Sequence, residues 1–185
     1  MSDPFDVLVV CVGNLCRSPL AERLLRVRLA DAPHVRVTSA GTRAVAGAAM
    51  DARAAAELDR LGGDPLGFEA RQLTADLVSD ADLVLTATRE LRTQVVELAP
   101  AALKRTFTLR ELAALLEERP WTCDHPTDLR ALIADAAAWR GSVADRGDAL
   151  DVPDPIGGPA DLHREAADLA YAATDVVASA LHLSS

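Results

Sequence analysis

The sequence predicts an α/β fold in three layers, in which a doubly wound, four-stranded parallel sheet lies between two layers of helices. Short apolar runs alternate with amphipathic segments along most of the chain, and this alternation is typical of parallel strands joined by right-handed crossovers. The first apolar run is followed directly by a loop and a helix, the arrangement at which doubly wound sheets bind ligands. The 185 residues (1–185) are expected to form a single domain with a sizeable core.

The individual strands and helices follow from local patterns. Residues 7–10 are aliphatic and mostly β-branched, as expected of a strand that is buried on both faces. Similar runs predict three more strands, at residues 35–39, 82–86 and 105–109. The first of these is expected to end before Gly41, which breaks the apolar run. The helical spacing of apolar residues predicts a helix that begins near residue 20, and further helices at 48–61, 75–78, 89–98, 111–118, 128–139 and 160–181.

The loop after the first strand, called loop 11–18 below, has the composition of an anion site. It reads Cys11-Val12-Gly13-Asn14-Leu15-Cys16-Arg17-Ser18. Because Pro19 suits the first turn of a helix, Ser18 is the expected N-cap. The backbone N–H groups of such a loop converge at the positive end of the helix dipole, where they bind a phosphate or another tetrahedral oxyanion. Arg17 adds a planar, two-pronged contact to that anion.

Cys11 is the expected nucleophile of this site. A helix N-terminus and a neighbouring arginine stabilise the thiolate form of a cysteine, and a thiolate beneath a bound phosphoryl group is aimed at phosphorus. The alternative is a small core residue, because buried cysteines are common and the Cys-x5-Arg-Ser pattern alone is a weak motif. Its setting between a strand and a helix favours the nucleophile. Gly13 suits a close approach of the backbone to the anion, and Asn14 tolerates a left-handed backbone.

The run CVGNLCRSP followed by AERLL resembles the low-molecular-weight protein tyrosine phosphatase family, which also includes some arsenate reductases. The resemblance continues at residues 39–42, 70–73 and 82–86 and at Asp154-Pro155. It leaves out roughly residues 117–150, which we expect to be an insertion on the rim of the site. It implies a flavodoxin-like fold and cleavage of a phosphate monoester through a phosphocysteine intermediate, without a cofactor or a metal. The site residues that it implies are catalytic Cys11, Arg17 and Asp154 and substrate-binding Val12, Gly13, Asn14, Leu15, Cys16 and Ser18.

The general acid is expected in the proline-flanked segment 151–155, called loop 151–155 below. A carboxylic acid over the bound phosphate can protonate the departing alcohol or phenol and then take a proton from the attacking water. Spacing alone leaves Asp151 as a competitor and leaves a purely structural Asp-Pro turn open. The family motif assigns the acid to Asp154. The resemblance also implies that Ser18 donates to the Cys11 thiolate, and that Ser39 supports Asn14.

Two departures from the family pattern affect the site. Phe68 stands where relatives commonly carry a histidine that braces the loop, so the bracing of this loop is expected to differ. Relatives that act on phosphotyrosine often carry aromatic residues after Asp-Pro, whereas this chain has Ile156-Gly157-Gly158. Trp121 or Trp139 from the expected insertion would then supply an aromatic wall. The predicted substrate is phosphotyrosine protein or another aryl phosphate monoester.

Two other functions remain open from the sequence. An arsenate reductase would use the same loop, although residues 87–96 hold no cysteine for a thiol relay. A catalytically inactive phosphate-binding module would not need the cysteine and the acid together. Cys16 is either a packed residue or the partner of Cys11 in a disulfide formed by peroxide. Cys123 and His125 lack further ligands at a usable spacing, so no metal site is expected there.

Composition excludes several classes of partner. The net charge of -9 argues against nucleic acid and against anionic membranes. We expect no signal peptide and no membrane span, and three cysteines suit a reducing cytoplasm better than a disulfide framework. A single lysine among 19 basic residues is typical of a GC-rich bacterial genome. The expected form is a monomer in which His34, His163 and His182 lie at the surface.

Overall fold

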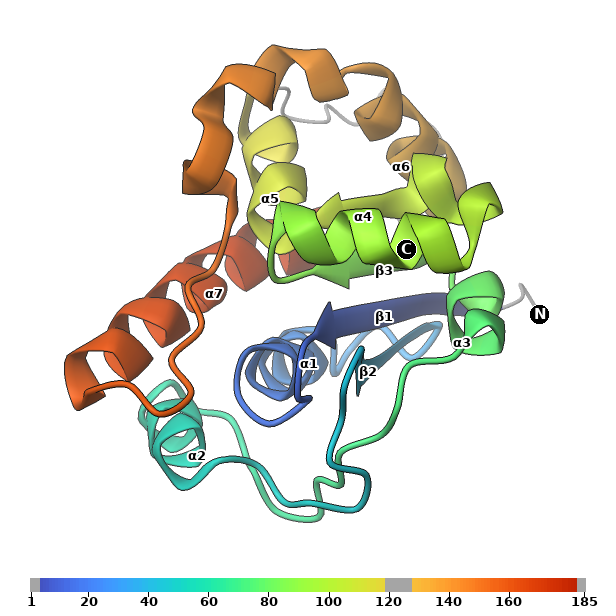
Figure 1. The fold of residues 1–185 in the computed structure, drawn as a ribbon. Coiled ribbons are helices and arrows are strands. Elements are labelled where there is room, and N and C mark those ends of the chain that lie inside the picture. Colours follow the sequence, from blue (N-terminus) through green and yellow to red (C-terminus); the bar gives the residue numbers. More distant parts are fainter. Residues whose placement is uncertain (1–3, 119–127, 183–185) are drawn as a thin grey trace.

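The computed structural model describes residues 4–118 and 128–182 and confirms the predicted α/β fold (Figure 1). The four parallel strands lie in the order β2-β1-β3-β4. Their bounds are Phe5–Cys11 for β1, Val35–Gly41 for β2, Leu83–Thr86 for β3 and Thr106–Thr108 for β4. The direction of winding reverses between β1 and β3, which is the switch point of a flavodoxin-like sheet.

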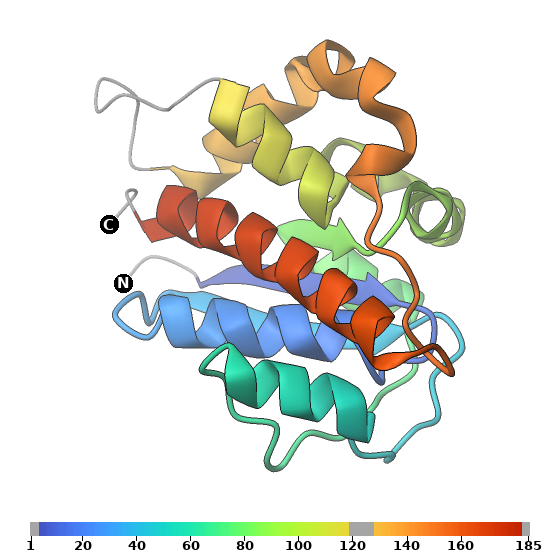
Figure 2. The ribbon, with the colours of Figure 1, turned by 90° about the vertical axis from the view of Figure 1, so that its left-hand side faces the viewer.

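Helices cover both faces of the sheet. The α-helices are α1 Arg17–Arg28, α2 Ala52–Arg60, α3 Ala75–Asp80, α4 Arg89–Leu98, α5 Leu109–Glu118, α6 Leu129–Ala138 and α7 Ala160–His182. Two 3₁₀ segments, η1 Pro100–Arg105 and η2 Arg140–Leu150, complete the described elements. Figure 2 shows α1, α5 and α7 on one face of the sheet, with α2 packed outside α1 and α7. None of the helices within 4–118 and 128–182 is both long enough and apolar enough to cross a membrane.

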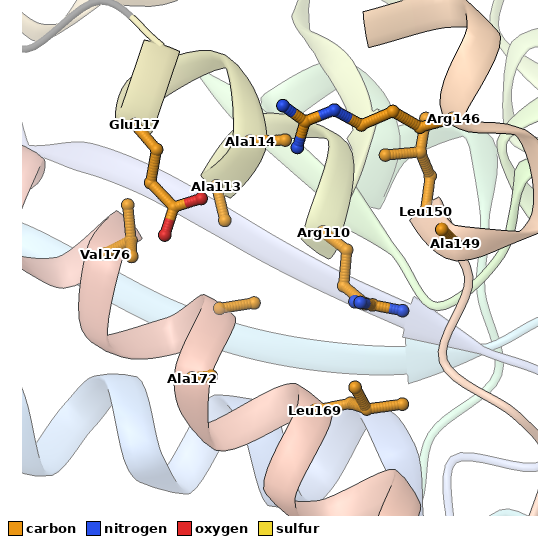
Figure 3. Close-up of a pocket in the computed structure, with 11 residues that line it drawn as sticks. Arg110, Ala113, Ala114, Glu117, Arg146, Ala149, Leu150, Leu169, Ala172 and Val176 are labelled. Carbon is orange, nitrogen blue, oxygen red and sulfur yellow. The ribbon is translucent and has the colours of Figure 1, made fainter.

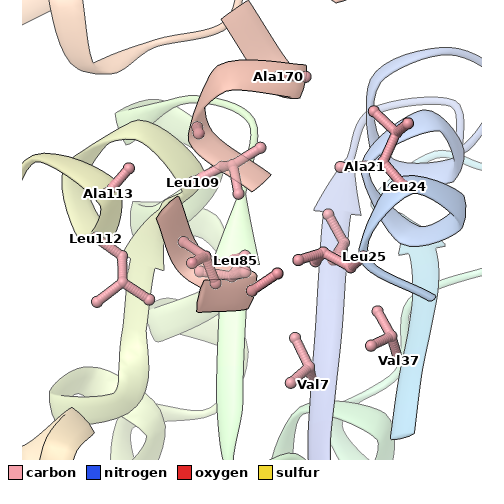
Figure 4. Close-up of a cluster of buried hydrophobic side chains, with 14 of the residues drawn as sticks. Val7, Ala21, Leu24, Leu25, Val37, Leu85, Leu109, Leu112, Ala113 and Ala170 are labelled. Carbon is pink, nitrogen blue, oxygen red and sulfur yellow. The ribbon is translucent and has the colours of Figure 1, made fainter. Parts of the chain in front are cut away.

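Alternate side chains of β1 enter two separate hydrophobic clusters. Val7 and Val9 join the larger cluster with α1, α5 and α7, part of which is drawn in Figure 4. Leu8 and Val10 join a second cluster with residues of α3, α4 and η1. Because successive side chains of a strand point to opposite faces, a continuous apolar run is the pattern that a strand between two helical layers requires.

The start of α1 differs from the prediction. The helix begins at Arg17, so Ser18 lies in its first turn and is not the N-cap. Cys16 occupies the N-cap position and makes no capping hydrogen bond with its side chain. Helix α2 likewise starts later than predicted, at Ala52, because the carboxylate of Asp51 accepts hydrogen bonds from the N–H groups of residues 53 and 54.

The expected insertion does not place its helix on the rim of the site. Arg130 in the first turn of α6 pairs with Asp82, just before β3, and lies over the ring of Phe5 at the start of β1. Both contacts are at the amino ends of the strands, opposite loop 11–18. Segment η2 then returns to the carboxyl ends, where the hydroxyl of Thr108 donates to the carbonyl of Leu150. Trp121, Cys123 and His125 lie outside the described residues.

One arginine of the 128–150 segment covers the edge strand of the sheet. Nη2 of Arg140 donates to the carbonyl of Thr106 at 2.7 Å, and its guanidinium lies 4.4 Å from the centre of the Phe107 ring. Unpaired carbonyls of an edge strand invite pairing with other chains, so this contact protects the edge at β4. The segment therefore protects the sheet and connects α5 with loop 151–155.

Candidate active site

Loop 11–18 and loop 151–155 enclose a cavity of about 110 Å³ beyond the carboxyl end of β1. The residues that line it are Cys11, Val12, Gly13, Leu15, Cys16, Arg17, Asp154 and Ile156. The structure thus brings the three predicted catalytic residues together with most of the predicted substrate-binding residues. Asn14, Ser18 and Ser39 are buried behind this lining, where they form a hydrogen-bond network.

The thiol of Cys11 lies at the last position of β1 and is 2% exposed. The hydroxyl of Ser18 donates to its Sγ over 3.0 Å. This hydrogen bond explains why Ser18 does not cap the helix, since its hydroxyl is directed at the sulfur. A hydroxyl donor and the N-terminus of α1 both stabilise a negative charge on sulfur.

Asn14 holds Ser18 in this position. Asn14 is fully buried and adopts the left-handed backbone that its residue type was expected to tolerate, with φ of 55°. Its Nδ2 donates at 2.9 Å to the hydroxyls of both Ser18 and Ser39. Its Oδ1 accepts from the backbone N–H of Arg71 at 2.9 Å. The side chain of Asn14 therefore links the loop to β2 and to the segment that precedes α3.

Glu22 completes this network, and sequence reasoning missed it. The hydroxyl of Ser39 donates to Oε2 of Glu22 at 2.5 Å, and Oε1 pairs with Arg26 at 2.9 Å. Glu22 is only 4% exposed. Its spacing with Arg26 is that of an ordinary surface pair on a helix, so no local pattern indicates that Glu22 is buried. Phe68, at the position of the family histidine, packs in the core beside Arg23.

Gly41 allows β2 to approach the loop closely. A Cβ at this position would lie 2.5 Å from the carbonyl oxygen of Val12 and 2.8 Å from the backbone nitrogen of Asn14. The next two residues, 42 and 43, donate N–H groups to the carbonyls of Cys11 and Val12. Gly41 was predicted to break the strand, whereas it is the last residue of β2 and leaves room for loop 11–18.

Arg17 faces the cavity and is 7% exposed. Its Nη2 donates to Oδ2 of Asp154 at 2.6 Å, and its Nη1 donates to the carbonyl of Val152 at 3.2 Å. Its Nε is buried and has no hydrogen-bond partner within the described part of the chain. A buried donor without a partner is rare, and here it supplies a free contact for an anion.

The two candidate acids have different environments. Oδ1 of Asp151 accepts from the backbone N–H of Arg89 at 2.8 Å, at the start of α4. The carbonyl of Asp151 accepts from Arg110, and the N–H of Val152 donates to the carbonyl of Ala87. Asp151 therefore anchors the loop, whereas the side chain of Asp154 lines the cavity and is 41% exposed.

Comparison with known proteins identifies the family. Residues 6–133 match the family model described as low molecular weight phosphotyrosine protein phosphatase. The chain belongs to this family. The resemblance predicted from loop 11–18 is therefore confirmed.

Individual members of this phosphatase family show how far the likeness extends. The low molecular weight protein-tyrosine-phosphatase Etp of Escherichia coli K12 is 42% identical over 102 residues, which are 55% of this chain and 67% of Etp. Low molecular weight protein-tyrosine phosphatase A of Mycobacterium tuberculosis is 42% identical over 136 residues, or 68% of this chain and 81% of the relative.

Solved structures extend the likeness over nearly the whole chain. The YwlE arginine phosphatase from Geobacillus stearothermophilus has a TM-score of 0.72 at 28% identity, covering 97% of this chain and 94% of that chain. Wzb of Vibrio vulnificus, in complex with benzylphosphonate, has a TM-score of 0.69 at 27% identity, and the match covers 96% of this chain and 99% of the Wzb chain.

A second cavity, of about 200 Å³, lies between α5, η2 and α7 (Figure 3). Arg110 and Arg146 both line it. Arg110 donates to the carbonyl of Asp151 in loop 151–155, and Arg146 pairs with Glu118. One nitrogen of each guanidinium therefore has a partner outside the cavity, and no cysteine lines this cavity to act as a nucleophile.

The histidines that were expected at the surface differ in exposure. His182 is exposed and His34 is half-buried, but His163 is 3% exposed and lies in the first turn of α7. Its burial corrects the prediction of a surface residue.

Cys16 is 5% exposed, and burial, followed by the negative charge of Asp51, raises the pKa of its thiol to about 12.

Removing the carboxylate of Glu22 is expected to weaken the loop. Glu22→Ala leaves the buried hydroxyl of Ser39 without its acceptor, which costs about 1–3 kcal/mol of unfolding free energy. Because Ser39 supports Asn14, activity should also fall. Denaturant unfolding and steady-state hydrolysis check both effects. The matched control is Arg26→Gln, which removes the half-exposed charge paired with Glu22 and the hydrogen bond from Nε to the Val37 carbonyl but leaves the contact between Ser39 and Glu22 in place, so activity should fall less than in Glu22→Ala. Equal losses of activity in the two variants would contradict this role of Glu22.

Proposed function

We propose that the chain hydrolyses phosphotyrosine in proteins, or another aryl phosphate monoester, through a phosphocysteine intermediate on Cys11. The observation that carries the proposal is the meeting of three groups in one cavity. The Cys11 thiol, with the Ser18 hydroxyl on its sulfur, shares the cavity with the carboxyl group of Asp154 and with Arg17, whose Nε has no partner among the described residues. A site for binding alone needs neither a nucleophile nor an acid.

The first step transfers the phosphoryl group to sulfur. The Cys11 thiolate attacks phosphorus in line with the departing oxygen, so a P–S bond forms as the P–O bond breaks. The backbone N–H groups of loop 11–18 and the guanidinium of Arg17 bind the equatorial oxygens and stabilise their charge. Asp154 gives its proton to the departing phenol oxygen.

The second step returns the thiolate. Asp154, now a carboxylate, takes a proton from a water molecule, and the resulting hydroxide attacks phosphorus. The P–S bond breaks, and inorganic phosphate leaves. The hydroxyl of Ser18 donates to the sulfur and stabilises the thiolate as a leaving group. The donors around the phosphate neutralise its charge, so the proposed cycle has no step that requires a metal ion.

The pair between Arg17 and Asp154 gives the acid its place in this cycle. In the structure, Asp154 occupies Nη2 of Arg17, a donor that a phosphate oxygen also needs. Substrate therefore separates the two side chains and releases Asp154 toward the leaving-group oxygen. Asn14 and Ser39 act behind the loop, where they hold Ser18 in place.

An apolar cavity wall supports an aryl group as the leaving group. Val12, Leu15 and Ile156 line the cavity, and Ile156 is 51% exposed at its mouth. Trp139, expected as an aromatic wall, is not among the lining residues. The Wzb structure with benzylphosphonate supports the same class of ligand. The YwlE relative is named an arginine phosphatase, but a charged guanidinium fits these apolar walls less well than a phenyl ring.

The proposal is tested by trapping the intermediate during turnover. The reduced protein is mixed with para-nitrophenyl phosphate in the presence of a chelator, quenched in acid and analysed by mass spectrometry. We expect a phosphoryl group on Cys11. Peptides that carry phosphotyrosine or phosphoarginine are then offered together as substrates. The phosphotyrosine peptide should be hydrolysed faster. A requirement for a divalent metal, or a phosphoryl group on another residue, would contradict the mechanism.

The same assay separates the two rival functions. Arsenate-dependent oxidation of added thiols, without phosphate release from the aryl ester, would favour an arsenate reductase. Tight phosphopeptide binding without turnover would favour an inactive binding module. Among the described residues the free thiols are Cys11 and Cys16, so a relay through a further described cysteine is not available.

We further propose that the enzyme acts as a monomer in the cytoplasm. One chain supplies both loops that line the cavity, so a single copy completes it. A thiol nucleophile also requires a compartment that keeps cysteines reduced. Sedimentation equilibrium and cell fractionation test the two statements, and an active dimer or an extracellular enzyme would contradict them.

A further inference from the structure

Three potential metal ligands from separate elements meet behind loop 11–18. They are the sulfur of Cys16, a carboxylate oxygen of Asp51 and a ring nitrogen of His163, and these atoms all lie within 4.8 Å of one another. Cys16 precedes α1, Asp51 precedes α2, and His163 lies in α7. The proposed hydrolysis assigns no role to His163 or Asp51.

Nδ1 of His163 is an unpaired polar atom among the described residues. The side chain is 3% exposed, and within residues 4–118 and 128–182 its Nδ1 is buried without a hydrogen-bond partner. The nearest carboxylate oxygen, Oδ1 of Asp51, is 3.8 Å away, beyond a hydrogen bond. Leaving a polar nitrogen buried and unpaired destabilises a folded protein. The position therefore indicates a missing partner for Nδ1.

Space and charge at the cluster suit a small cation. Cys16 and His163 line a cavity of about 10 Å³, roughly the space that one water-sized particle needs. The carboxylate of Asp51, with its Oδ1 3.8 Å from Nδ1 of His163, supplies a negative charge that attracts a cation to this point.

We propose that Cys16, Asp51 and His163 bind a single zinc ion. Thiolate, imidazole and carboxylate are the ligands that zinc prefers, and water would supply the fourth position of a tetrahedral site. Ligand atoms about 2.0–2.3 Å from zinc lie roughly 3.5 Å apart, so small side-chain rotations complete the site. Cys16 loses its proton to solvent when its sulfur binds the ion.

Such an ion would connect loop 11–18 to helices α2 and α7. The backbone N–H of Asp51 already donates to the carbonyl of Leu15 at 2.9 Å, so the cluster is attached to the loop at two neighbouring residues. His163 connects it to α7. Zinc is therefore assigned a structural role, in which it stabilises the folded loop, and it takes no part in the proposed transfer of the phosphoryl group.

The experiment uses the Cys11→Ser protein, so that the catalytic thiol cannot bind the ion. The full chain is reduced, stripped of metal and titrated with zinc, and bound metal is counted after equilibrium dialysis. We expect one ion per chain. Cobalt as a probe should show a thiolate-to-metal absorption band that disappears with Cys16→Ser and persists with Cys123→Ser. Zinc should also raise the melting temperature.

Substitutions at the other two ligands complete the test. In the Cys11→Ser protein, His163→Gln and Asp51→Asn should each weaken zinc binding at least about tenfold, while His34→Gln should leave it unchanged. Asparagine still caps a helix, so Asp51→Asn tests the ligand with little loss of α2 stability. Unchanged affinity in either variant, no binding to a folded Cys11→Ser protein, or binding only when Cys11 is present would overturn the proposal.

Discussion

Cys11→Ser is expected to lower the hydrolysis of para-nitrophenyl phosphate on the order of 10⁶-fold, the scale on which enzymes lose turnover without their nucleophile. A serine hydroxyl is not ionised at neutral pH, and the groups around residue 11 are arranged for a thiolate. The Ser18 hydroxyl, 3.0 Å from Sγ, stabilises a charge that serine does not carry. Steady-state kinetics on the reduced proteins measures the loss.

The same variant should keep its fold and its anion site. Arg17 and the backbone of loop 11–18 are unchanged, so inorganic phosphate should still inhibit or bind with an affinity close to that of the parent. Thermal unfolding and phosphate titration provide these controls. Residual turnover within 100-fold of the parent, with an intact fold, would show that another residue attacks phosphorus.

Asp154→Asn is expected to change rate and affinity in opposite directions. Loss of the general acid should slow turnover by about 10² to 10⁴-fold, most for phenols that leave poorly. Affinity for phosphate should rise, because a neutral amide competes less strongly than a carboxylate for Nη2 of Arg17 and places no negative charge beside the anion. A series of aryl phosphates with different leaving groups and a phosphate inhibition constant measure the two effects.

Asp151→Asn is the matched control for this variant. Asp151 contacts the backbone N–H of Arg89 and stands outside the cavity lining, so its substitution should affect stability without a dependence on the leaving group. If Asp151→Asn instead slowed poor leaving groups and Asp154→Asn did not, the acid would have to be reassigned to Asp151.

Sequence patterns predicted the parts of the molecule that depend on neighbouring residues. The bounds of α4 agree with the prediction at both ends, and α7 ends one residue later than predicted, because their patterns are local. Strand β1 includes the predicted residues 7–10 and extends beyond them at both ends. Cys11 and Arg17 lie within one loop, so their meeting in a cavity follows from the turn between β1 and α1. Asp154 was found only through the family motif, since nothing local distinguishes it from Asp151.

The missed features all depend on segments that are distant in the sequence. Glu22 is buried because β2 brings Ser39 against α1, and no pattern within the helix shows this. His163 is buried because α7 packs over α1 and α2. Ser18 has the residue type of an N-cap, but the sulfur of Cys11 takes its hydroxyl. The position of α6 involves its packing in the core and a contact of Arg130 with Asp82, 48 residues away.

The anchoring of Asp151 has a consequence for how substrates enter. Hydrogen bonds to α4, to α5 and to the residue after β3 fix the base of loop 151–155. The acid needs only a side-chain rotation to reach its working position, and no segment of backbone has to swing shut over the substrate. An entrance that stays open during turnover accommodates phosphorylated side chains still attached to a large folded protein. Discrimination among such proteins then depends on the surfaces that meet around the entrance, beginning with exposed Ile156.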